Sequence, residues 1–322
     1  MNARALLLAL VCCLPLAAQE PEQVQAALEE AYALCVRGQE QGAEGRPALE
    51  RACARYAEVL AQVEGLQISG QKKALVRQIA HYNTACARSL LGEVDAGLEA
   101  LKQALEAGYD DLARLGADES LAALRQNPRF HNLLARTRAK LDGEAAAAAQ
   151  SVLSPEALFP FAFEVTTLDG ATLSLDALRG KVVIVDYWGT WCGPCRQEIP
   201  HLIELQREFG DLLVIVGMTY ERTQGAEAEA GVRRFAKELG IPYALVMADR
   251  GLLEKVPNLE GFPTTLFLDA QGRVRAKEVG YREHGYLRQL VLALLAEQAG
   301  GEAPETPAPE EPAPEEPGIG PF

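Results

Sequence analysis

The spacing of apolar residues changes near residue 155, and this change constrains the fold more than any other feature of the chain. Over residues 21–141, apolar side chains recur every three or four residues, as on one face of a helix. Over residues 158–299, short runs rich in β-branched residues alternate with helical segments. The 322-residue chain is therefore predicted to be multidomain, with an all-α domain followed by an α/β domain.

The first predicted domain, residues 21–141, contains two antiparallel helix pairs. The helical spacing covers residues 24–35 and 49–60 in the first pair, and residues 75–91 and 94–105 in the second. Gly42 and Gly45 predict the turn of the first pair, and Gly92 predicts the turn of the second. Two successive pairs indicate a repeat.

Residues 71–141 resemble a tetratricopeptide-like repeat segment. The resemblance rests on Tyr82-Asn83-Thr84-Ala85-Cys86, Leu91-Gly92, Ala104-Leu105, Gly108 and Asn127-Pro128-Arg129-Phe130. It implies a surface for a protein or peptide partner. The first pair matches by helical period alone, and a plain helical bundle without a binding groove is the alternative.

A linker is expected at residues 142–157, before the α/β domain at residues 158–299. The expected strands are residues 163–167, 172–175, 182–187, 212–218, 264–269 and 273–279. The expected helices are residues 196–209, 228–239 and 286–299. This order gives a parallel strand–helix–strand unit followed by an antiparallel pair and a helix, which predicts an α/β sandwich around a mixed sheet.

Both ends of the chain differ from these domains. Residues 1–18 place Arg4 before a short apolar run and small residues, which is typical of a secretory signal peptide. A periplasmic or otherwise exported protein is expected, with a mature chain that begins near Gln19 and has no membrane span. Residues 300–322 repeat Glu, Pro and Ala, which predicts a disordered acidic tail.

Two kinds of partner are disfavoured. The net charge of −14 leaves no basic surplus to neutralise phosphates, so nucleic acid is not an expected partner. Cys12 and Cys13 raise lipid anchoring as an alternative to a free mature chain. That alternative is disfavoured because Val11 or Cys12 stands where a lipidation signal places a small residue.

The motif Cys192-Gly193-Pro194-Cys195 lies after a predicted buried strand and begins a predicted helix. At a helix N-terminus, the free amide groups and the helix dipole favour negative charge, so a thiol there ionises more easily. Two intervening residues allow the sulfur atoms to bridge, so the second thiol can release a mixed disulfide formed by the first. The motif therefore predicts thiol–disulfide exchange, with Cys192 as the nucleophile and Cys195 as the resolving thiol.

The residues around this motif resemble the thioredoxin family over about residues 158–299. The resemblance rests on the segment 185–200, which reads Val-Asp-Tyr-Trp-Gly-Thr-Trp-Cys-Gly-Pro-Cys-Arg-Gln-Glu-Ile-Pro. Lys181-Val182-Val183, Glu198 and Pro200 are similar to the TlpA-like extracytoplasmic branch of that family. The resemblance implies a thioredoxin-like fold.

The resemblance also implies roles for further residues. Asp186 matches the buried acid that exchanges a proton with the second thiol, and Glu198 matches the helix glutamate of many TlpA-like proteins. Which of the two carries the proton is open. Pro263 matches the cis-proline that faces the disulfide and offers backbone groups to a substrate. The expected substrate-binding residues are Trp191, Gly193, Pro194, Phe262 and Pro263.

The predicted function is that of a thiol–disulfide oxidoreductase acting on protein disulfides, without a cofactor. Reduction is the expected direction because Gly-Pro is the thioredoxin dipeptide, while oxidation stays open. Its partners would be protein thiols or disulfides and an upstream thiol reductant or oxidant.

Other functions fit less well. A tetratricopeptide-type scaffold with a subsidiary thioredoxin fold is one alternative, and a peroxiredoxin-like peroxidase is another. The peroxidase is disfavoured because Gly189 stands where a peroxiredoxin places Thr. A metal site is not expected, since only His201 lies near the cysteine pair and no second CxxC motif exists.

Three further cysteines lie in the helical domain. Cys35 and Cys53 lie at similar distances from the turn between antiparallel helices, so they can form a disulfide or remain as two buried thiols. Cys86 is expected to stay unpaired.

Overall fold

The computed structural model describes residues 19–223 and 225–300. The expected signal peptide at residues 1–18 and the acidic tail from residue 301 onward lie outside the described residues. The chain divides into two compact units, with the division after Leu141. An all-helical unit precedes a unit with a mixed sheet, as the change in apolar spacing predicts.

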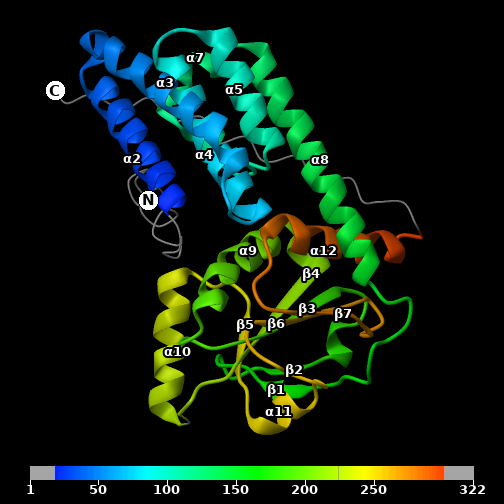
Figure 1. Ribbon diagram of the computed structural model, residues 1–322. Helices are drawn as coiled ribbons and strands as arrows, with labels where there is room; N and C mark the ends of the chain where they lie inside the picture. The colour runs from blue at the N-terminus through cyan, green and yellow to red at the C-terminus, as the bar shows by residue number, and fades with distance from the viewer. Residues whose placement is uncertain (1–18, 224, 301–322) are drawn as a thin grey trace, which may run out of the picture. The chain divides into compact units, whose positions relative to one another are not determined.

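The first unit consists of consecutive helices joined by short turns (Figure 1). α2 (Gln19–Glu40) packs on α3 (Arg46–Gln62), α3 packs on α4 (Gly70–Leu90), and α4 packs on α5 (Val94–Glu106). The shorter elements are the 3-10 turns η1 (Gly42–Gly45), η2 (Val63–Gly65) and η3 (Glu119–Leu121) and the helices α6 (Leu112–Ala117) and α7 (Ala122–Arg125). The helical segments expected from the sequence are confirmed.

Local sequence features explain the second helix pair. The Ser69 side chain accepts a hydrogen bond from the Lys72 N–H at 3.3 Å and so caps the start of α4. Gly92 has a φ of 76°, a conformation that glycine adopts without strain, and it forms the turn to α5. Ala85 and Cys86 are buried, and their small side chains let the two helices pack closely. The tetratricopeptide-like character of the unit stays a prediction.

Helix α8 (Pro128–Val152) begins in the first unit and extends into the second. The stretch 142–157, expected as a linker, is helical as far as Val152. The alanines at 145–149 explain this difference, because alanine has the highest intrinsic helix propensity. Ala149 and Leu153 are buried in the core of the second unit.

The second unit is built on a five-stranded sheet with the strand order β5-β4-β3-β6-β7. The central strand β3 (Val182–Trp188) pairs in parallel with β4 (Leu213–Thr219) and antiparallel with β6 (Thr264–Leu268). β5 (Ala244–Met247) runs parallel to β4, and β7 (Val274–Val279) runs antiparallel to β6. This is the mixed sheet predicted for a thioredoxin-like fold.

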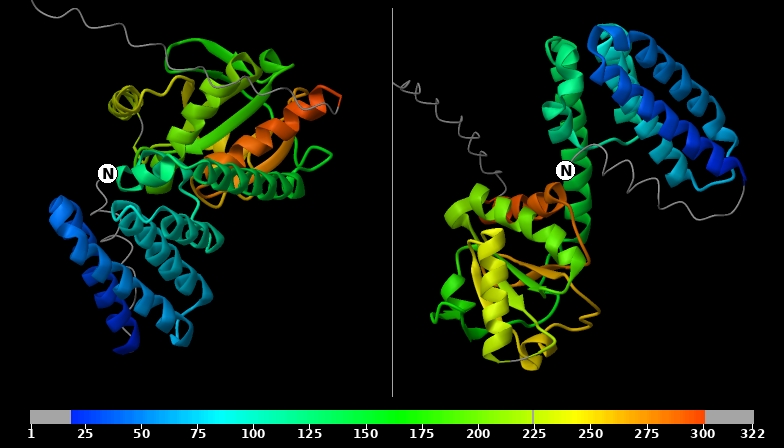
Figure 2. Two further views of the ribbon diagram at one scale, coloured as in Figure 1. Left: turned by 90° about the horizontal axis from the view of Figure 1, so that it is seen from above. Right: turned by 90° about the vertical axis from the view of Figure 1, so that its left-hand side faces the viewer.

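Other elements cover both faces of the sheet (Figure 1, Figure 2). One face is covered by α9 (Gly193–Phe209), α10 (Ala226–Leu239) and α12 (His284–Gln298). The other face is covered by the hairpin of β1 (Glu164–Thr166) and β2 (Thr172–Ser174), by η4 (Asp176–Leu178) and by α11 (Arg250–Glu254). The turn η5 (Gly210–Leu212) joins α9 to β4.

The strand β3 positions the site. Its seven residues are all buried, and their side chains alternate between the two cores. Ile184 and Trp188 belong to the core beneath α9, while Val185 and Tyr187 belong to the opposite core. Asp186 therefore lies on the α9 side, below the start of that helix.

Among the short elements of the second unit, β5 and α11 are absent from the sequence prediction. β5 has only four residues, too few to show a period, and its place at the sheet edge comes from pairing with β4. α11 has five residues and is capped by Asp249, the residue before its first turn, whose side chain accepts the Leu252 N–H at 2.8 Å.

Within residues 19–223 and 225–300, no helix has both the length and the apolar character needed to cross a membrane.

Candidate active site

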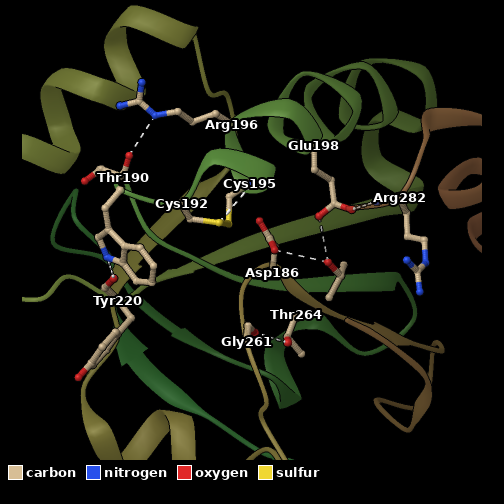
Figure 3. Close-up of a disulfide and its surroundings, with 12 residues drawn as sticks. Asp186, Thr190, Cys192, Cys195, Arg196, Glu198, Tyr220, Gly261, Thr264 and Arg282 are labelled. Carbon is tan, nitrogen blue, oxygen red and sulfur yellow. Dashed lines mark hydrogen bonds between the residues drawn. A yellow bond between two sulfur atoms is a disulfide. The ribbon is translucent and has the colours of Figure 1, made fainter. Parts of the chain in front are cut away.

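Cys192 and Cys195 form a disulfide at the junction of β3 and α9 (Figure 3). Their Cα atoms are 5.3 Å apart, and Cys192 is the N-cap residue of α9. The Cys192 sulfur accepts a hydrogen bond from the Cys195 N–H at 3.2 Å. This amide and the helix dipole would stabilise a thiolate on Cys192 once the disulfide opens.

Both cysteines are largely covered. Cys192 is 4% exposed and Cys195 is 1% exposed, so Cys192 is the more accessible of the two. Pro194 lies in the first turn of α9, where no helical partner for an amide hydrogen is needed. The structure thus brings both predicted cysteines and the Gly193-Pro194 turn together as expected, although their roles stay predictions.

Trp191 lies beside the disulfide with 40% of its surface exposed. Its indole N–H donates to the Tyr220 carbonyl oxygen at 3.2 Å. A Cβ atom on Gly189 would lie 2.7 Å from the Trp191 Nε1 atom and 2.7 Å from the same Tyr220 oxygen. Only glycine at position 189 leaves room for this arrangement of the indole.

Phe262 and Pro263 lie at the same end of the sheet. The Phe262-Pro263 peptide bond is cis, and Thr264, the next residue, pairs with Tyr187 near the end of β3. The Phe262 ring meets the Trp191 ring edge to face, with centroids 5.7 Å apart, and packs against the core cluster that contains both cysteines. An exposed indole and a partly buried phenyl ring therefore lie next to the disulfide.

Asp186 is 1% exposed and lies below the disulfide in Figure 3. Burial raises the pKa of Asp186 well above its usual range, because a charged carboxylate loses its hydration, and the neighbouring Glu198 carboxylate raises the pKa further. A buried acid with a raised pKa can hold a proton near neutral pH.

Glu198 is also 1% exposed and follows Cys195 by three residues on α9. One of its carboxylate oxygens accepts the Arg282 N–H at 2.8 Å. Burial raises the pKa of Glu198 to about 7, while the Arg282 N–H acts in the opposite direction by stabilising the charged form. The structure therefore brings both predicted acids together in one buried group.

The Thr265 hydroxyl lies 3.4 Å from one Glu198 oxygen and 3.5 Å from one Asp186 oxygen. Thr265 and Arg282 are not among the site residues predicted from the sequence. Thr265 pairs directly with Asp186 across β3 and β6, a register that the sequence does not fix. Arg282 contributes a backbone N–H, for which no side-chain pattern exists.

Residues beside the motif hold the loop before α9, and these were also missed. The Thr190 N–H and hydroxyl both donate to the Glu221 carboxylate, at 2.8 and 3.0 Å. The Arg196 side chain donates to the Thr190 carbonyl oxygen at 3.0 Å. These bonds connect the loop to α9 and to the residues after β4.

The remaining cysteines, Cys35, Cys53 and Cys86, carry free thiols in the structure. Of the two states left open by the sequence, Cys35 and Cys53 thus adopt the unpaired one. Burial raises the pKa of Cys35 to about 12 and the pKa of Cys86 well above its usual range. These thiols are therefore poor nucleophiles.

His201, the histidine nearest the cysteine pair in sequence, accepts or donates a hydrogen bond with the Tyr281 hydroxyl at 3.1 Å. Among the residues that the structure describes, no group of three or more His, Cys, Asp or Glu side chains is arranged to hold a metal ion.

Comparison with known proteins identifies related sequences. The Redoxin family matches residues 154–290. The thioredoxin-like protein YneN of Bacillus subtilis is 35% identical over 118 residues, which are 37% of this chain and 68% of YneN. The thiol-disulfide oxidoreductase ResA of Bacillus cereus is 28% identical over 132 residues, which are 40% of this chain and 74% of ResA.

Among solved structures, a thiol:disulfide interchange protein of the thioredoxin family from Chlorobium tepidum is 30% identical. The match covers 44% of this chain and 97% of that protein, with a TM-score of 0.39.

Proposed function

Since the chain belongs to the redoxin family of thioredoxin-like proteins, we propose that it is an exported thiol–disulfide oxidoreductase that reduces protein disulfides. One observation carries the proposal: Cys192, the N-cap residue of α9, forms a CxxC disulfide on the same side of the sheet as two buried carboxyl groups (Figure 3). The name of ResA, a thiol-disulfide oxidoreductase, supports the same activity.

The reductive cycle starts from the dithiol form. The Cys192 thiolate attacks one sulfur atom of a substrate disulfide, forms a mixed disulfide and releases the first substrate thiolate. Cys195 then loses its proton and attacks the Cys192 sulfur atom. The second substrate thiolate leaves, and the Cys192–Cys195 disulfide remains. An upstream thiol reductant returns two electrons and two protons and restores the dithiol form.

The second step needs a proton acceptor next to Cys195, which is 1% exposed. Asp186 and Glu198 serve this purpose, because burial places their pKa values closer to that of a thiol than the pKa of an exposed carboxyl group. The first step needs no such acceptor, because the α9 N-terminus already favours the Cys192 thiolate.

The surface around Cys192 would bind the substrate. Trp191 and Phe262 offer apolar area beside the sulfur atom, and the backbone next to Pro263 offers hydrogen-bonding groups to an extended chain. An unfolded or flexible protein segment carrying a disulfide fits such a surface. The helical unit would bring a partner protein or peptide to this domain.

The direction and the location rest on the sequence. The Gly193-Pro194 dipeptide is that of reducing thioredoxins, and the first 18 residues have the pattern of a cleaved export signal. In an oxidising compartment, a reductase needs a dedicated donor of electrons, so a membrane-linked or secreted thiol reductant is the expected upstream partner.

A redox titration of the Cys192–Cys195 pair tests the direction, and insulin-disulfide reduction tests the activity. A reductase should have a potential below about −200 mV and should reduce insulin with dithiothreitol as the electron donor. The Cys192→Ser variant should be inactive. A potential near −120 mV would instead indicate an oxidant. The absence of insulin turnover by the folded wild-type protein would favour a binding protein whose helical unit carries the function.

A further inference from the structure

The Thr265 hydroxyl is the polar group shared by the two buried acids. Thr265 is 1% exposed and lies on β6, directly opposite Asp186 on β3. Its oxygen lies within hydrogen-bonding distance of both carboxyl groups, which belong to different elements. A hydroxyl group has one hydrogen to donate and two lone pairs that accept. The Thr265 hydroxyl can therefore donate its hydrogen to one carboxylate. It can accept a hydrogen bond from the other carboxyl group at the same time only when that second group is protonated.

We propose that Thr265 is a positioning residue for the exchange reaction: its hydroxyl links Asp186 and Glu198 so that the two acids hold one proton between them and pass it through the Thr265 oxygen. The proposal rests on the function proposed above, since it assigns the proton acceptor of that reaction to the pair. It also answers which acid accepts the proton, because neither acts alone.

The surroundings of the two acids set where the shared proton lies at rest. Two carboxylates in a buried site resist being charged together, so one proton is retained. The Arg282 N–H donates to Glu198 at 2.8 Å and favours the negative charge there. The proton then lies on Asp186, which donates to the Thr265 oxygen, while the Thr265 hydrogen points to Glu198. Figure 3 shows the Asp186 carboxylate between the disulfide and the Glu198 carboxylate.

The relay step conserves atoms and charge. The Asp186 proton moves to the Thr265 oxygen as the Thr265 hydrogen moves to Glu198, so Asp186 becomes a carboxylate and Glu198 becomes neutral. Asp186 can then take the proton of Cys195 as that sulfur attacks Cys192. The departing substrate thiolate takes up a proton from water, and the acid pair returns its extra proton to water. No oxidant or reductant is needed beyond the disulfide itself.

Other ionisable groups also face the pair and are present in every variant. Tyr243, which precedes β5, is buried and interacts electrostatically with both acids. Glu278 on β7 and the Arg282 side chain both interact electrostatically with Glu198. The Glu278 carboxylate and the Arg282 guanidinium group also form an ion pair with each other at 2.7 Å. The cysteine pair carries no charge while it is a disulfide. Substitution of Thr265 removes none of these groups. Because Glu278 lies directly opposite Thr265 on β7, the comparison of Thr265→Ala with Thr265→Ser isolates the effect of the hydroxyl.

The test measures the ionisation of Asp186 and Glu198 in the full chain with the disulfide intact, by carbon-13 NMR of the side-chain carboxyl groups. Thr265→Ser keeps the hydroxyl, and Thr265→Ala and Thr265→Val remove it. Thr219→Val is the matched control, because Thr219 is buried on β4, the strand on the other side of β3, and its hydroxyl has no hydrogen-bond partner among the described residues.

Loss of the hydroxyl should raise the midpoint of the pair's ionisation by about one pH unit, a tenfold change in proton affinity, because the charged form loses a donor. Thr265→Ser and Thr219→Val should titrate like the wild type. If Thr265→Ala and Thr265→Ser titrate alike, Thr265 is a packing residue and the proposal is wrong. This comparison stays decisive even if Thr265→Val fails to fold.

A kinetic measurement separates this proposal from the proposed function. The Cys195 attack is followed in a single turnover from a preformed mixed disulfide at Cys192. In Thr265→Ala its pH profile should shift in the same direction as the carboxyl titration, and Thr265→Ser should restore the wild-type profile. If the wild type itself does not resolve the mixed disulfide, the proposed function fails, whereas the carboxyl titration still decides the role of Thr265. If Thr265→Ala shifts the carboxyl titration but not the pH profile of the Cys195 attack, Thr265 has no role in the reaction.

Discussion

Cys192 and Cys195 differ in their surroundings, and this difference predicts opposite phenotypes for their serine variants. Cys192 caps α9 and is the more exposed of the two sulfur-bearing residues. Cys195→Ser should keep the nucleophile but lose the resolving thiol, so mixed disulfides with partner proteins should accumulate. Non-reducing gels and mass spectrometry of the captured proteins measure this.

Cys192→Ser is the matched control and should trap no partner. Equal trapping by both variants, or trapping by neither, would contradict the assigned roles.

Glu198 makes the stability of the folded protein depend on pH. Its pKa is raised by burial from 4.5 to about 7, so the folded state binds a proton more tightly than the unfolded state. Protonated Glu198 therefore contributes fully to the free energy of unfolding below pH 4.5, and this contribution is lost as the pH rises through about 7. Glu198→Gln keeps an oxygen for the Arg282 N–H and removes the charge. It should raise the free energy of unfolding at pH 8 by roughly 2–3 kcal/mol and leave it nearly unchanged at pH 4.

Urea denaturation of the disulfide form at both pH values measures this difference. An equal effect of Glu198→Gln at pH 4 and pH 8 would show that the substitution acts through packing and not through ionisation.

The loop between β3 and α9 depends on a close approach at Gly189. Gly189→Ala would place a methyl group 2.7 Å from both the Trp191 nitrogen and the Tyr220 oxygen that it bonds. We expect the indole to move, with a loss of about 1–3 kcal/mol in unfolding free energy and a change in tryptophan fluorescence. Gly285→Ala is the control, because a Cβ atom there meets no neighbour within 4 Å. Unchanged fluorescence and stability in Gly189→Ala would contradict the close packing.

At the level of elements, the sequence predicts the strands and helices that a local residue pattern determines. It does not predict the elements whose place depends on pairing with a neighbouring strand. β3 could be predicted from its β-branched run, and the start of α9 from the cysteine motif and Pro194. β5 could not, because an edge strand of four residues is held by its neighbour. The same holds inside the site, where Asp186 and Glu198 were predicted but Thr265 was not. Its place beside them depends on the register of β3 and β6.

The boundary between the two units of the whole molecule falls within helix α8. Its position determines which fragment contains the complete second unit. Ala149 and Leu153 are buried in its core, and the Ser154 N–H donates to the Arg275 carbonyl oxygen at 2.8 Å. A fragment of residues 142–300 should therefore be more stable than a fragment of residues 158–300, the boundary that the sequence suggests. The expected difference is roughly 3–5 kcal/mol, from lost apolar burial and from hydrogen-bonding groups left without partners.

Thermal or urea unfolding of the two fragments measures this difference. Leu153→Ala in the longer fragment is the control and should cost about 2–3 kcal/mol, a part of the same loss. Equal stability of the two fragments would place the boundary of the folded unit at residue 158.

The order of the two units along the chain affects how the protein is made. Helices α2 to α5, which bury Cys53 and Cys86 and partly cover Cys35, precede the redox domain and emerge first during synthesis. Once they fold, these three thiols are shielded before Cys192 and Cys195 leave the ribosome. Of the five cysteines among the described residues, only Cys192 and Cys195 then remain available, and these two can pair in one way. We therefore expect the helical unit to limit incorrect disulfides while the Cys192–Cys195 pair forms.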